Sequence, residues 1–275
     1  MKRAAVVLCG GKSSRMGRAK AWLPWFGKPM IEHVVGVLRP VVDEVVVVTS
    51  KAIPLPLLDA RIVEDREPEL GPLAGIREGL EAAGSDLAFV TSTDSPFLTA
   101  DHVVRMLDGG IAAAPSADGH VQVLCAAYPG SAWKEADDLL RSGQRRPLAL
   151  LDRLGFERIE FETESGEKPG PWQGFNRPDE YLFWARAIEP DATARVELLG
   201  RAALEVESRE FESPIGTLGE VLGALPIPDS LGLMDGDRLS KAFLVSLGGR
   251  DLVRSLDLPV GPGEQISVLD ALAGG

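Results

Sequence analysis

The chain has 275 residues, 45% of them hydrophobic, and a formal net charge of −12, which predicts a globular protein of one large domain, or of one medium and one small domain. The acidic balance argues against a general nucleic-acid surface, because a phosphate backbone requires a basic stripe, and two cysteines with three scattered histidines provide neither a disulfide framework nor zinc-ligand spacing. Since no apolar run approaches the roughly 18 residues of a membrane span, and Ala4–Cys9 is too short for a signal-peptide core, we expect a cytoplasmic protein without membrane contacts.

In chain order, apolar β-branched runs alternate with amphipathic stretches. This alternation predicts an α/β domain over the first 186 residues, in which a parallel sheet is covered by helices on both faces and binds ligands at the carboxyl ends of its strands. The predicted strands are Ala4–Leu8, Val45–Thr49, Leu87–Thr91, a weaker one at 121–128, and 156–162; the predicted helices are Met30–Leu38, Leu73–Ala82, Ala100–Leu107, 131–140 and 145–154.

After Pro190 the pattern changes. Strands are predicted at 194–200, 205–212, 241–247 and 265–269, with one helix at 217–225 and a Gly-Gly turn at 248–249. This order is typical of an α+β unit rather than of repeated βαβ units. The predicted domains are therefore 1–189 and 190–275.

The segment LCGGKSSRMGRAK, residues 8–20, directly follows the first predicted strand. Residues 1–31 carry seven Lys/Arg and no Asp or Glu, which indicates a small anionic ligand in an otherwise acidic chain. Adjacent glycines let backbone N–H groups approach a phosphate, and a following helix N-terminus adds its positive dipole end. Neither a Walker loop nor a G-x-G-x-x-G fingerprint is present. The alternative is an ordinary glycine turn with solvated cations.

Four segments in order carry a resemblance to a known family: LCGGKSSRMGRAK at 8–20, FGKPMIEHV at 26–34, GPLAGI at 71–76 and TSTDSPFL at 91–98. They resemble the nucleotidyltransferase fold family, and most of all the molybdenum cofactor guanylyltransferases, over residues 3–186. The resemblance implies a three-layer, Rossmann-like α/β domain. It also implies transfer of GMP from GTP to the terminal phosphate of molybdopterin, with release of pyrophosphate.

Attack of a phosphate oxygen on the α-phosphorus of GTP requires cations that neutralise the reacting phosphates. The resemblance implies this catalytic role for Arg15 and Lys20. It also implies that Asp94 binds Mg²⁺ with one carboxylate while substrate phosphates complete the coordination shell. An Asp before Ser-Pro can instead cap a turn.

The nucleotide contacts implied by the resemblance are Leu8, Cys9, Gly10, Gly11, Lys20, Asp65, Gly71, Pro72, Leu73 and Asp94. Among them Asp65 is suited to accept hydrogen bonds from the N1–H and N2–H₂ groups of guanine, a donor pair that CTP lacks. The alternative is that Asp65 is a solvated residue of the charged run EDREPE.

The chain departs from the family pattern at several positions. Cys9 replaces the usual Ala, and VVTSK at 47–51 replaces an Asn-x-Asn. In GFNRPDEY at 174–181, Gly174 replaces the first Asn of a second Asn-x-Asn, whereas Asn176 keeps the second. The resemblance implies that Asn176 binds molybdopterin; alternatively, it caps the helix that starts near Pro178.

From about Ala194 the sequence resembles the ubiquitin-like small subunit of molybdopterin synthase, including TLGEVLGAL at 217–225 and a final Gly-Gly. The resemblance implies a ubiquitin-like (β-grasp) sulfur carrier in which Gly275 becomes a thiocarboxylate. The implied partners are an adenylating enzyme and the synthase large subunit. A frayed terminus is the alternative for the last residues.

Two other functions remain open at this point. The first unit could be a molybdopterin cytidylyltransferase or a sugar-phosphate nucleotidyltransferase. The whole chain could also be a non-catalytic carrier whose transferase domain has decayed, because Asn positions of the family are lost.

Overall fold

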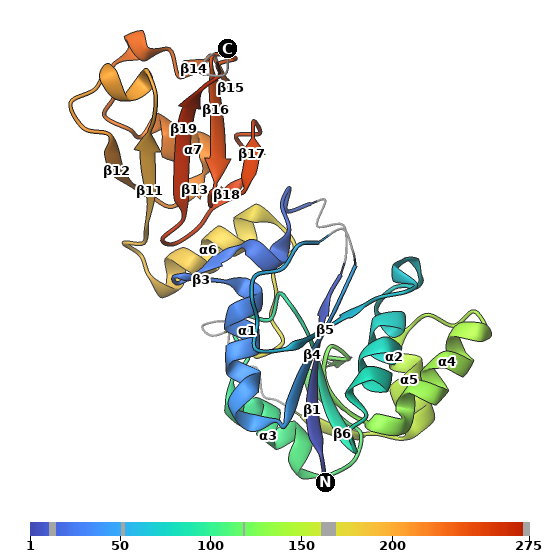
Figure 1. The fold of residues 1–275 in the computed structure, drawn as a ribbon. Helices are drawn as coiled ribbons and strands as arrows, with labels where there is room; N and C mark the ends of the chain where they lie inside the picture. The colour runs from blue at the N-terminus through green and yellow to red at the C-terminus, as the bar shows by residue number, and fades with distance from the viewer. Residues whose placement is uncertain (11–14, 51–52, 118, 161–168, 272–275) are drawn as a thin grey trace. The chain divides into compact units, whose positions relative to one another are not determined.

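The computed structural model describes residues 1–10, 15–50, 53–117, 119–160 and 169–271 (Figure 1). Contacts divide the chain into two compact units. The described parts of 1–12, 19–22 and 29–174 form the first unit, and those of 13–18, 23–28 and 175–275 form the second. Among the described residues, no helix is long and apolar enough to cross a membrane.

A mixed sheet forms the centre of the first unit. Its strands lie in the order β10-β7-β9-β6-β1-β4-β5, and β8 pairs with β7. The strands are β1 (Arg3–Cys9), β4 (Glu44–Thr49), β5 (Arg61–Glu64), β6 (Leu87–Ser92), β7 (Ala113–Ala117), β8 (His120–Val121), β9 (Cys125–Pro129) and β10 (Glu157–Glu160). Elsewhere, β2 (Pro24–Trp25) pairs with β3 (Lys28–Pro29).

Parallel pairing is confirmed for the three strongest predicted strands, since β1 is parallel to both β4 and β6, and β4 is parallel to β5. The prediction of an all-parallel sheet is wrong at β9, which is antiparallel to β6 and β7. The strand predicted at 121–128 is interrupted by a turn in which the Cys125 N–H donates to the Gln122 carbonyl at 3.1 Å. Because this connection from β7 to β9 is too short for a crossover helix, β9 returns antiparallel.

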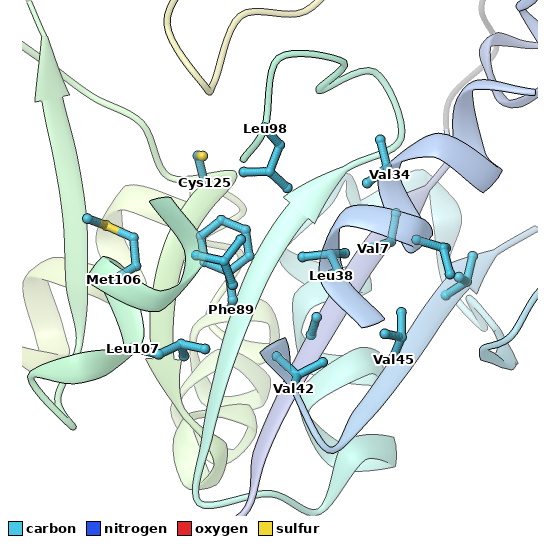
Figure 2. Packing of buried hydrophobic residues seen from close by; sticks show 14 of the residues in the cluster. Val7, Val34, Leu38, Val42, Val45, Phe89, Leu98, Met106, Leu107 and Cys125 are labelled. Atoms are coloured by element: carbon cyan, nitrogen blue, oxygen red, sulfur yellow. The ribbon is translucent and has the colours of Figure 1, made fainter. Parts of the chain in front are cut away.

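Five helices cover the two faces of this sheet: α1 (Met30–Leu38), α2 (Pro72–Ala83), α3 (Ala100–Asp108), α4 (Trp133–Arg141) and α5 (Pro147–Leu154). On one face, Ala5 and Val7 of β1 pack with apolar residues of α1 and α3 (Figure 2). On the other face, Ala4 and Val6 pack with α2, and the same cluster includes residues of α4 and α5. The side chains of these four residues of β1, Ala4 to Val7, are fully buried. Successive side chains of β1 point to opposite faces of the sheet, and both faces are covered by helices. The predicted three layers, helix, sheet and helix, follow from this.

Two glycines allow α2 to lie very close to the sheet. A Cβ at Gly79 would be 2.2 Å from Val6 Cγ1, and one at Gly75 would be 3.1 Å from Leu8 Cδ2. The two positions are four residues apart and therefore lie on one face of the helix. Consequently the N-terminus of α2 is held next to the carboxyl end of β1.

We expect Gly79→Ala to lower the free energy of unfolding by about 1–3 kcal/mol, because the added methyl overpacks the interface between α2 and β1. Gly36→Ala is the control. Gly36 is exposed within α1, and a Cβ there meets nothing within 4 Å, so the same change should stabilise the protein by about 0.5–1 kcal/mol. Urea unfolding midpoints at constant m-value measure both effects, and equal midpoints for the two variants would contradict the expectation.

The second unit is built on the sheet β12-β11-β19-β16-β17. Helix α7 packs on it through Leu218, Val221 and Leu222. The elements are α6 (Pro178–Ile188), β11 (Thr193–Leu198), β12 (Glu210–Pro214), β13 (Gly216–Thr217), α7 (Leu218–Gly223), β14 (Met234–Asp235), β15 (Arg238–Leu239), β16 (Phe243–Leu247), β17 (Asp251–Val253), β18 (Pro259–Val260) and β19 (Gln265–Asp270).

The four predicted strands and the predicted helix occur in the predicted order, whereas the short strands β13, β14, β15, β17 and β18 were not predicted. Two further differences concern a strand boundary and α6. The strand predicted at 205–212 begins only at Glu210, because a short 3-10 helix at Ala202–Leu204 precedes it. Helix α6 belongs by its contacts to the second unit, whereas the predicted division follows it; the boundary at Pro190 stays a prediction. Helix α7 starts as predicted, since Thr217 and Glu220 form a capping box.

Candidate functional site

The carboxyl ends of β1 and β6 are tied together by a short hydrogen-bonded link. Both the backbone N–H and the hydroxyl of Thr93 donate to the Leu8 carbonyl at 3.1 Å. This link brings the chain after β1 close to the loop that carries Asp94. Among the described residues, none lies within 4 Å of where a Cβ at Gly10 would stand.

Cys9 contributes backbone rather than side chain to this edge. Its thiol is 4% exposed and belongs to the apolar cluster beneath the sheet edge. Burial raises the pKa of the Cys9 thiol, although hydrogen bonds with Thr93 and Thr49 oppose that shift. The replacement of Ala by Cys therefore adds a buried thiol and no reactive thiolate.

Lys20 and Asp94 form an ion pair at the same edge. Lys20 begins a short 3-10 helix, Lys20–Trp22, and its Nζ lies 2.5 Å from Asp94 Oδ2. Each side chain is only about one-fifth exposed, at 20% and 21%. The structure thus brings together two residues that the resemblance assigned to catalysis, and it leaves both partly accessible to a ligand.

Gly174 lies against Asp94. A Cβ at this glycine would be 2.5 Å from the Asp94 carbonyl oxygen and 3.3 Å from its Oδ2. Such distances exclude any side chain at position 174 unless the Asp94 backbone moves. The family pattern has an Asn at this position. In this chain a glycine is required, because the backbones of residues 174 and 94 lie very close together.

Asp65 follows β5 and continues the same edge. Its N–H donates to the Thr49 carbonyl at 2.8 Å, and its Oδ1 accepts the Glu67 N–H at 3.0 Å. Burial raises the pKa of Asp65, while the hydrogen bond from Glu67 opposes the shift. Asp65 is therefore an ordered, half-buried acceptor rather than a freely solvated member of its charged run.

The predicted nucleotide loop at 71–73 forms the N-terminus of α2. Gly71 occupies the N-cap position with φ +82°, a value that favours glycine. The Leu73 side chain is fully buried in the core. A ligand at this end would therefore meet backbone atoms and the helix dipole, not the leucine side chain.

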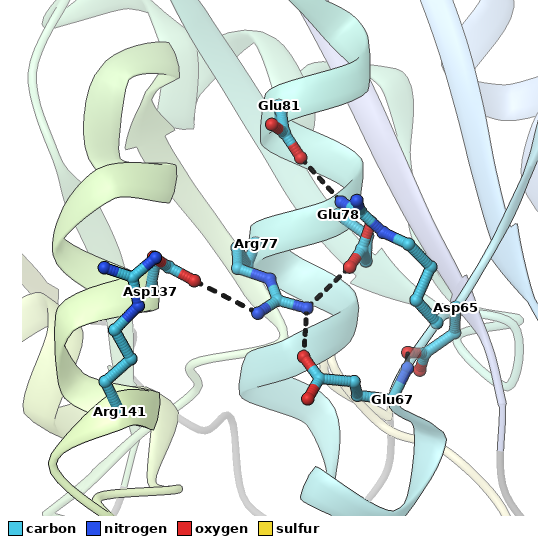
Figure 3. Close-up of polar contacts among 8 residues, drawn as sticks. Asp65, Glu67, Arg77, Glu78, Glu81, Asp137 and Arg141 are labelled. Carbon is cyan, nitrogen blue, oxygen red and sulfur yellow. Dashed lines mark hydrogen bonds and ion pairs between the residues drawn. The ribbon is translucent and has the colours of Figure 1, made fainter.

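A network of charges around the buried Arg77 and Glu78, which sequence reasoning missed, supports the Asp65 loop (Figure 3). The Arg77 guanidinium, with 9% of its side chain exposed, lies 2.7 Å from Glu67, 2.6 Å from Glu78 and 3.2 Å from Asp137. Burial opposes the charge of Arg77, but these carboxylates raise its pKa. In the sequence, only the acid-rich run at 64–69 indicated such a network, and the run does not show which of its residues pair with Arg77.

The remaining predicted site residues are either part of the second unit or outside the described residues. Arg15 is in the second unit, at a pocket that Arg177 and Phe183 also line. Asn176 is in the second unit too, where its N–H donates to Glu180 Oε2 at 2.7 Å. The N-cap residue of α6 is Arg177 rather than Asn176. Gly11 and Gly275 lie outside the described residues.

Asp94 is the carboxylate paired with Lys20 in this site. Among the described ranges, no group of three or more His, Cys, Asp or Glu side chains could hold a metal ion. A lone carboxylate suits Mg²⁺, which is commonly bound by one or two carboxylates together with substrate phosphates and water. The donor set therefore fits an ion that arrives with a nucleotide.

A three-layer α/β unit with a glycine loop, a lysine and an aspartate at the carboxyl edge of parallel strands is the arrangement of a nucleotidyltransferase. The model of the MobA-like NTP transferase domain matches residues 5–157, and the chain belongs to this family. A probable molybdenum cofactor guanylyltransferase of Mycobacterium tuberculosis (strain H37Rv) is 37% identical over 165 residues, which are 57% of this chain and 82% of that protein.

Solved structures agree with this assignment. Molybdopterin-guanine dinucleotide biosynthesis protein A from Archaeoglobus fulgidus superimposes with a TM-score of 0.54 at 25% identity, over 68% of this chain and 97% of that one. The 2-C-methyl-D-erythritol 4-phosphate cytidylyltransferase from Thermus thermophilus gives 0.52 at 20% identity, over 66% and 95%. The latter supports the fold alone. The predicted nucleotidyltransferase fold of the first unit is confirmed.

We expect Gly174→Ala to reduce the turnover of nucleotidyl transfer by at least about tenfold, because a displacement of about 1 Å at a reacting group can have effects of this size. Pyrophosphate release measures turnover, and urea unfolding verifies that the variant is folded. Gly109→Ala is the control, since a Cβ there meets its nearest atom at an ordinary 3.5 Å. Unchanged turnover in Gly174→Ala would show that the contact with Asp94 is unimportant.

Proposed function

We propose that the first unit transfers GMP from GTP to the terminal phosphate of molybdopterin and releases pyrophosphate. The observation that carries this proposal is the Lys20–Asp94 pair at the carboxyl edge of the parallel strands. The relative from Mycobacterium tuberculosis, a probable molybdenum cofactor guanylyltransferase, supports the choice of substrates.

In this mechanism the binding of the nucleotide separates Lys20 from Asp94, and each of the two residues then has its own function. Asp94 would hold Mg²⁺, which supplies charge neutralisation at the phosphates. The Lys20 ammonium, freed from Asp94, donates to phosphate oxygens. Backbone N–H groups at Leu8–Gly11 orient the triphosphate, and Arg15 is proposed to stabilise the leaving pyrophosphate.

Base selection is proposed to depend on Asp65 and on the backbone at Gly71–Leu73. The half-buried carboxylate of Asp65 accepts from both guanine donors, which a cytosine or uracil base does not offer in that pattern. Asn176 is proposed to contact molybdopterin. Thermal shifts with GTP, CTP and UTP separate this proposal from a cytidylyltransferase or a sugar-phosphate nucleotidyltransferase.

Asp94→Asn tests the transferase proposal. The amide is nearly isosteric but is a much poorer Mg²⁺ ligand, so turnover should fall by at least about a hundredfold, which corresponds to the several kcal/mol a metal supplies. The assay is Mg²⁺-dependent pyrophosphate release from GTP and molybdopterin. Asp59→Asn is the matched control, because the Asp59 side chain is 80% exposed. Near-wild-type turnover in Asp94→Asn would remove this residue from the site, and an inactive wild type would favour the non-catalytic carrier.

For residues 190–275 we propose a β-grasp sulfur carrier. The topology favours it: the first strand of the sheet, β11, is antiparallel to β12 and parallel to the last strand, β19, with α7 packed on one face. In the proposed chemistry, ATP adenylates the Gly275 carboxylate and releases pyrophosphate. A sulfide donor then displaces AMP, which leaves a thiocarboxylate. The proposed partners are the adenylating enzyme and the large subunit of molybdopterin synthase.

Deleting Gly274 and Gly275 tests the carrier proposal. Sulfur loading should be abolished, because the acceptor carboxylate and its unbranched approach are both removed, whereas pyrophosphate release by the first unit should continue. Intact mass after incubation with the adenylating enzyme, ATP and a sulfide donor reports the exchange of one oxygen for one sulfur. If the full chain is never loaded while a separate carrier in the same reaction is, the carrier proposal fails.

A further inference from the structure

The second unit contains a buried ion pair between the two ends of the sequence. Arg18 Nη1 lies 2.6 Å from Glu264 Oε1, and the two side chains are only 5% and 3% exposed. The same Arg18 nitrogen donates to the Pro259 carbonyl at 3.1 Å. Glu264 Oε2 accepts the Gly261 N–H at 3.1 Å. The Glu264 carboxylate and the Pro259 carbonyl thus hold Arg18 beside the turn that joins β18 to β19, and the Gly261 N–H in turn holds Glu264.

The neighbours of Arg18 pack against the same region. Met16 is fully buried. Gly17 has φ +75°, and a Cβ there would be 2.6 Å from Leu258 Cδ2. Leu258 itself belongs to the core around α7. Residues 16–18, which follow the paired glycines of the nucleotide loop in the sequence, are therefore part of the packing of the C-terminal sheet.

The segment after Lys20–Trp22 is anchored in the second unit as well. The Tyr181 hydroxyl donates to the Pro24 carbonyl, and the ring of Trp25 lies 5.4 Å from that of Phe175 and 6.2 Å from that of Tyr181. A Cβ at Gly261 would collide with the Tyr181 hydroxyl oxygen. The sequence segments that precede and follow Lys20–Trp22 consequently both contact residues that lie after position 174.

The energetics of the pair indicate a role in geometry rather than in stability. Within the described residues, Arg18 Nε and Nη2 and Glu264 Oε1 are buried without a hydrogen-bond partner, so the contact between Arg18 and Glu264 is an ion pair. Burial raises the pKa of Glu264, and Arg18 opposes this shift. A buried pair with incomplete hydrogen bonding is often no more stable than apolar residues of the same volume. The hydrogen bond from Arg18 to the Pro259 carbonyl, in contrast, is directional, and together with the ion pair it restricts the position of residue 18.

We propose that Arg18 and Glu264 are positioning residues for nucleotide binding, so that the 258–264 segment sets the conformation of the nucleotide loop. This inference rests on the proposed binding of GTP by that loop. Lys20 follows Arg18 by two residues, and its Cα can therefore lie at most about 7 Å from that of Arg18. Holding Arg18 limits where the Lys20 ammonium can reach. Nucleotide transfer then depends on a segment far outside the family's matched region.

Glu264→Gln in the full chain tests this proposal. The amide keeps the shape of the side chain but removes the charge that holds Arg18. We expect the KM for GTP to rise about tenfold, with a smaller change in kcat, and we expect faster hydrogen exchange in peptides that cover residues 16–20. Glu212→Gln is the matched control, because it removes the same charge from an exposed position on β12 and should alter neither quantity.

The double variant Arg18→Met/Glu264→Gln is the control for a loss of folding in Glu264→Gln. It leaves no unpaired buried charge, so it should unfold near the wild-type temperature and still show the raised KM and the faster exchange. If either folded variant keeps both wild-type values, the positioning role is wrong. If wild-type protein binds no GTP, the proposed function fails, whereas the exchange measurement still decides whether Glu264 holds the loop.

Discussion

The parallel pairing of β1 with β4 and β6 is the constraint on which the candidate site depends. It places the ends of these strands at one edge, so that residues distant in sequence, such as Gly10 and Asp94, follow neighbouring strands. Gly75 and Gly79 of α2 are a second constraint. They let the helix pack closely on β1, and this packing keeps the N-terminus of α2 beside the end of that strand. The site is thus made of loops whose starting points are fixed by the sheet and whose backbone groups are available to an anion.

Buried arginines then fix the parts of these loops that the sheet does not reach. Arg77 holds Glu67, which is hydrogen bonded through its N–H to Asp65. Arg18 holds the sequence just before Lys20 through Glu264. In both places a guanidinium inside the protein contacts more than one acceptor, and the planar geometry of the group restricts each acceptor to one position.

The sequence was sufficient to predict the strands whose residues are continuously apolar. β1, β4 and β6 were predicted because burial on both faces requires such runs. β5, with the residues RIVE, and β7, with AAPSA, were missed since neither has that signature. The antiparallel direction of β9 depends on a turn at Gln122 that no periodicity reports. Sheet connectivity was therefore less predictable than the strands themselves.

The candidate site shows the same distinction between local patterns and spatial contacts. Lys20 and Asp94 could be named in advance because a family pattern links them, although nothing in their local sequences states that they meet. Arg77 and Glu264 could not, since their partners are specified only by packing. Asn176 was given a capping alternative from its place before Pro178, but the helix begins with Arg177 as N-cap. A shift of one residue in the start of the helix changes which residue is the N-cap, and local sequence does not determine the start that closely.

Gly174 shows how a departure from a family pattern can be a structural requirement. In the pattern an Asn stands at this position, yet here any Cβ would press on the Asp94 carbonyl oxygen at 2.5 Å. An asparagine would force the Asp94 loop away from Lys20 and break the ion pair between them. The loss of the amide is therefore coupled to a closer approach of the two backbones, and whatever contact the family's Asn makes with a substrate must be made in this chain by other groups.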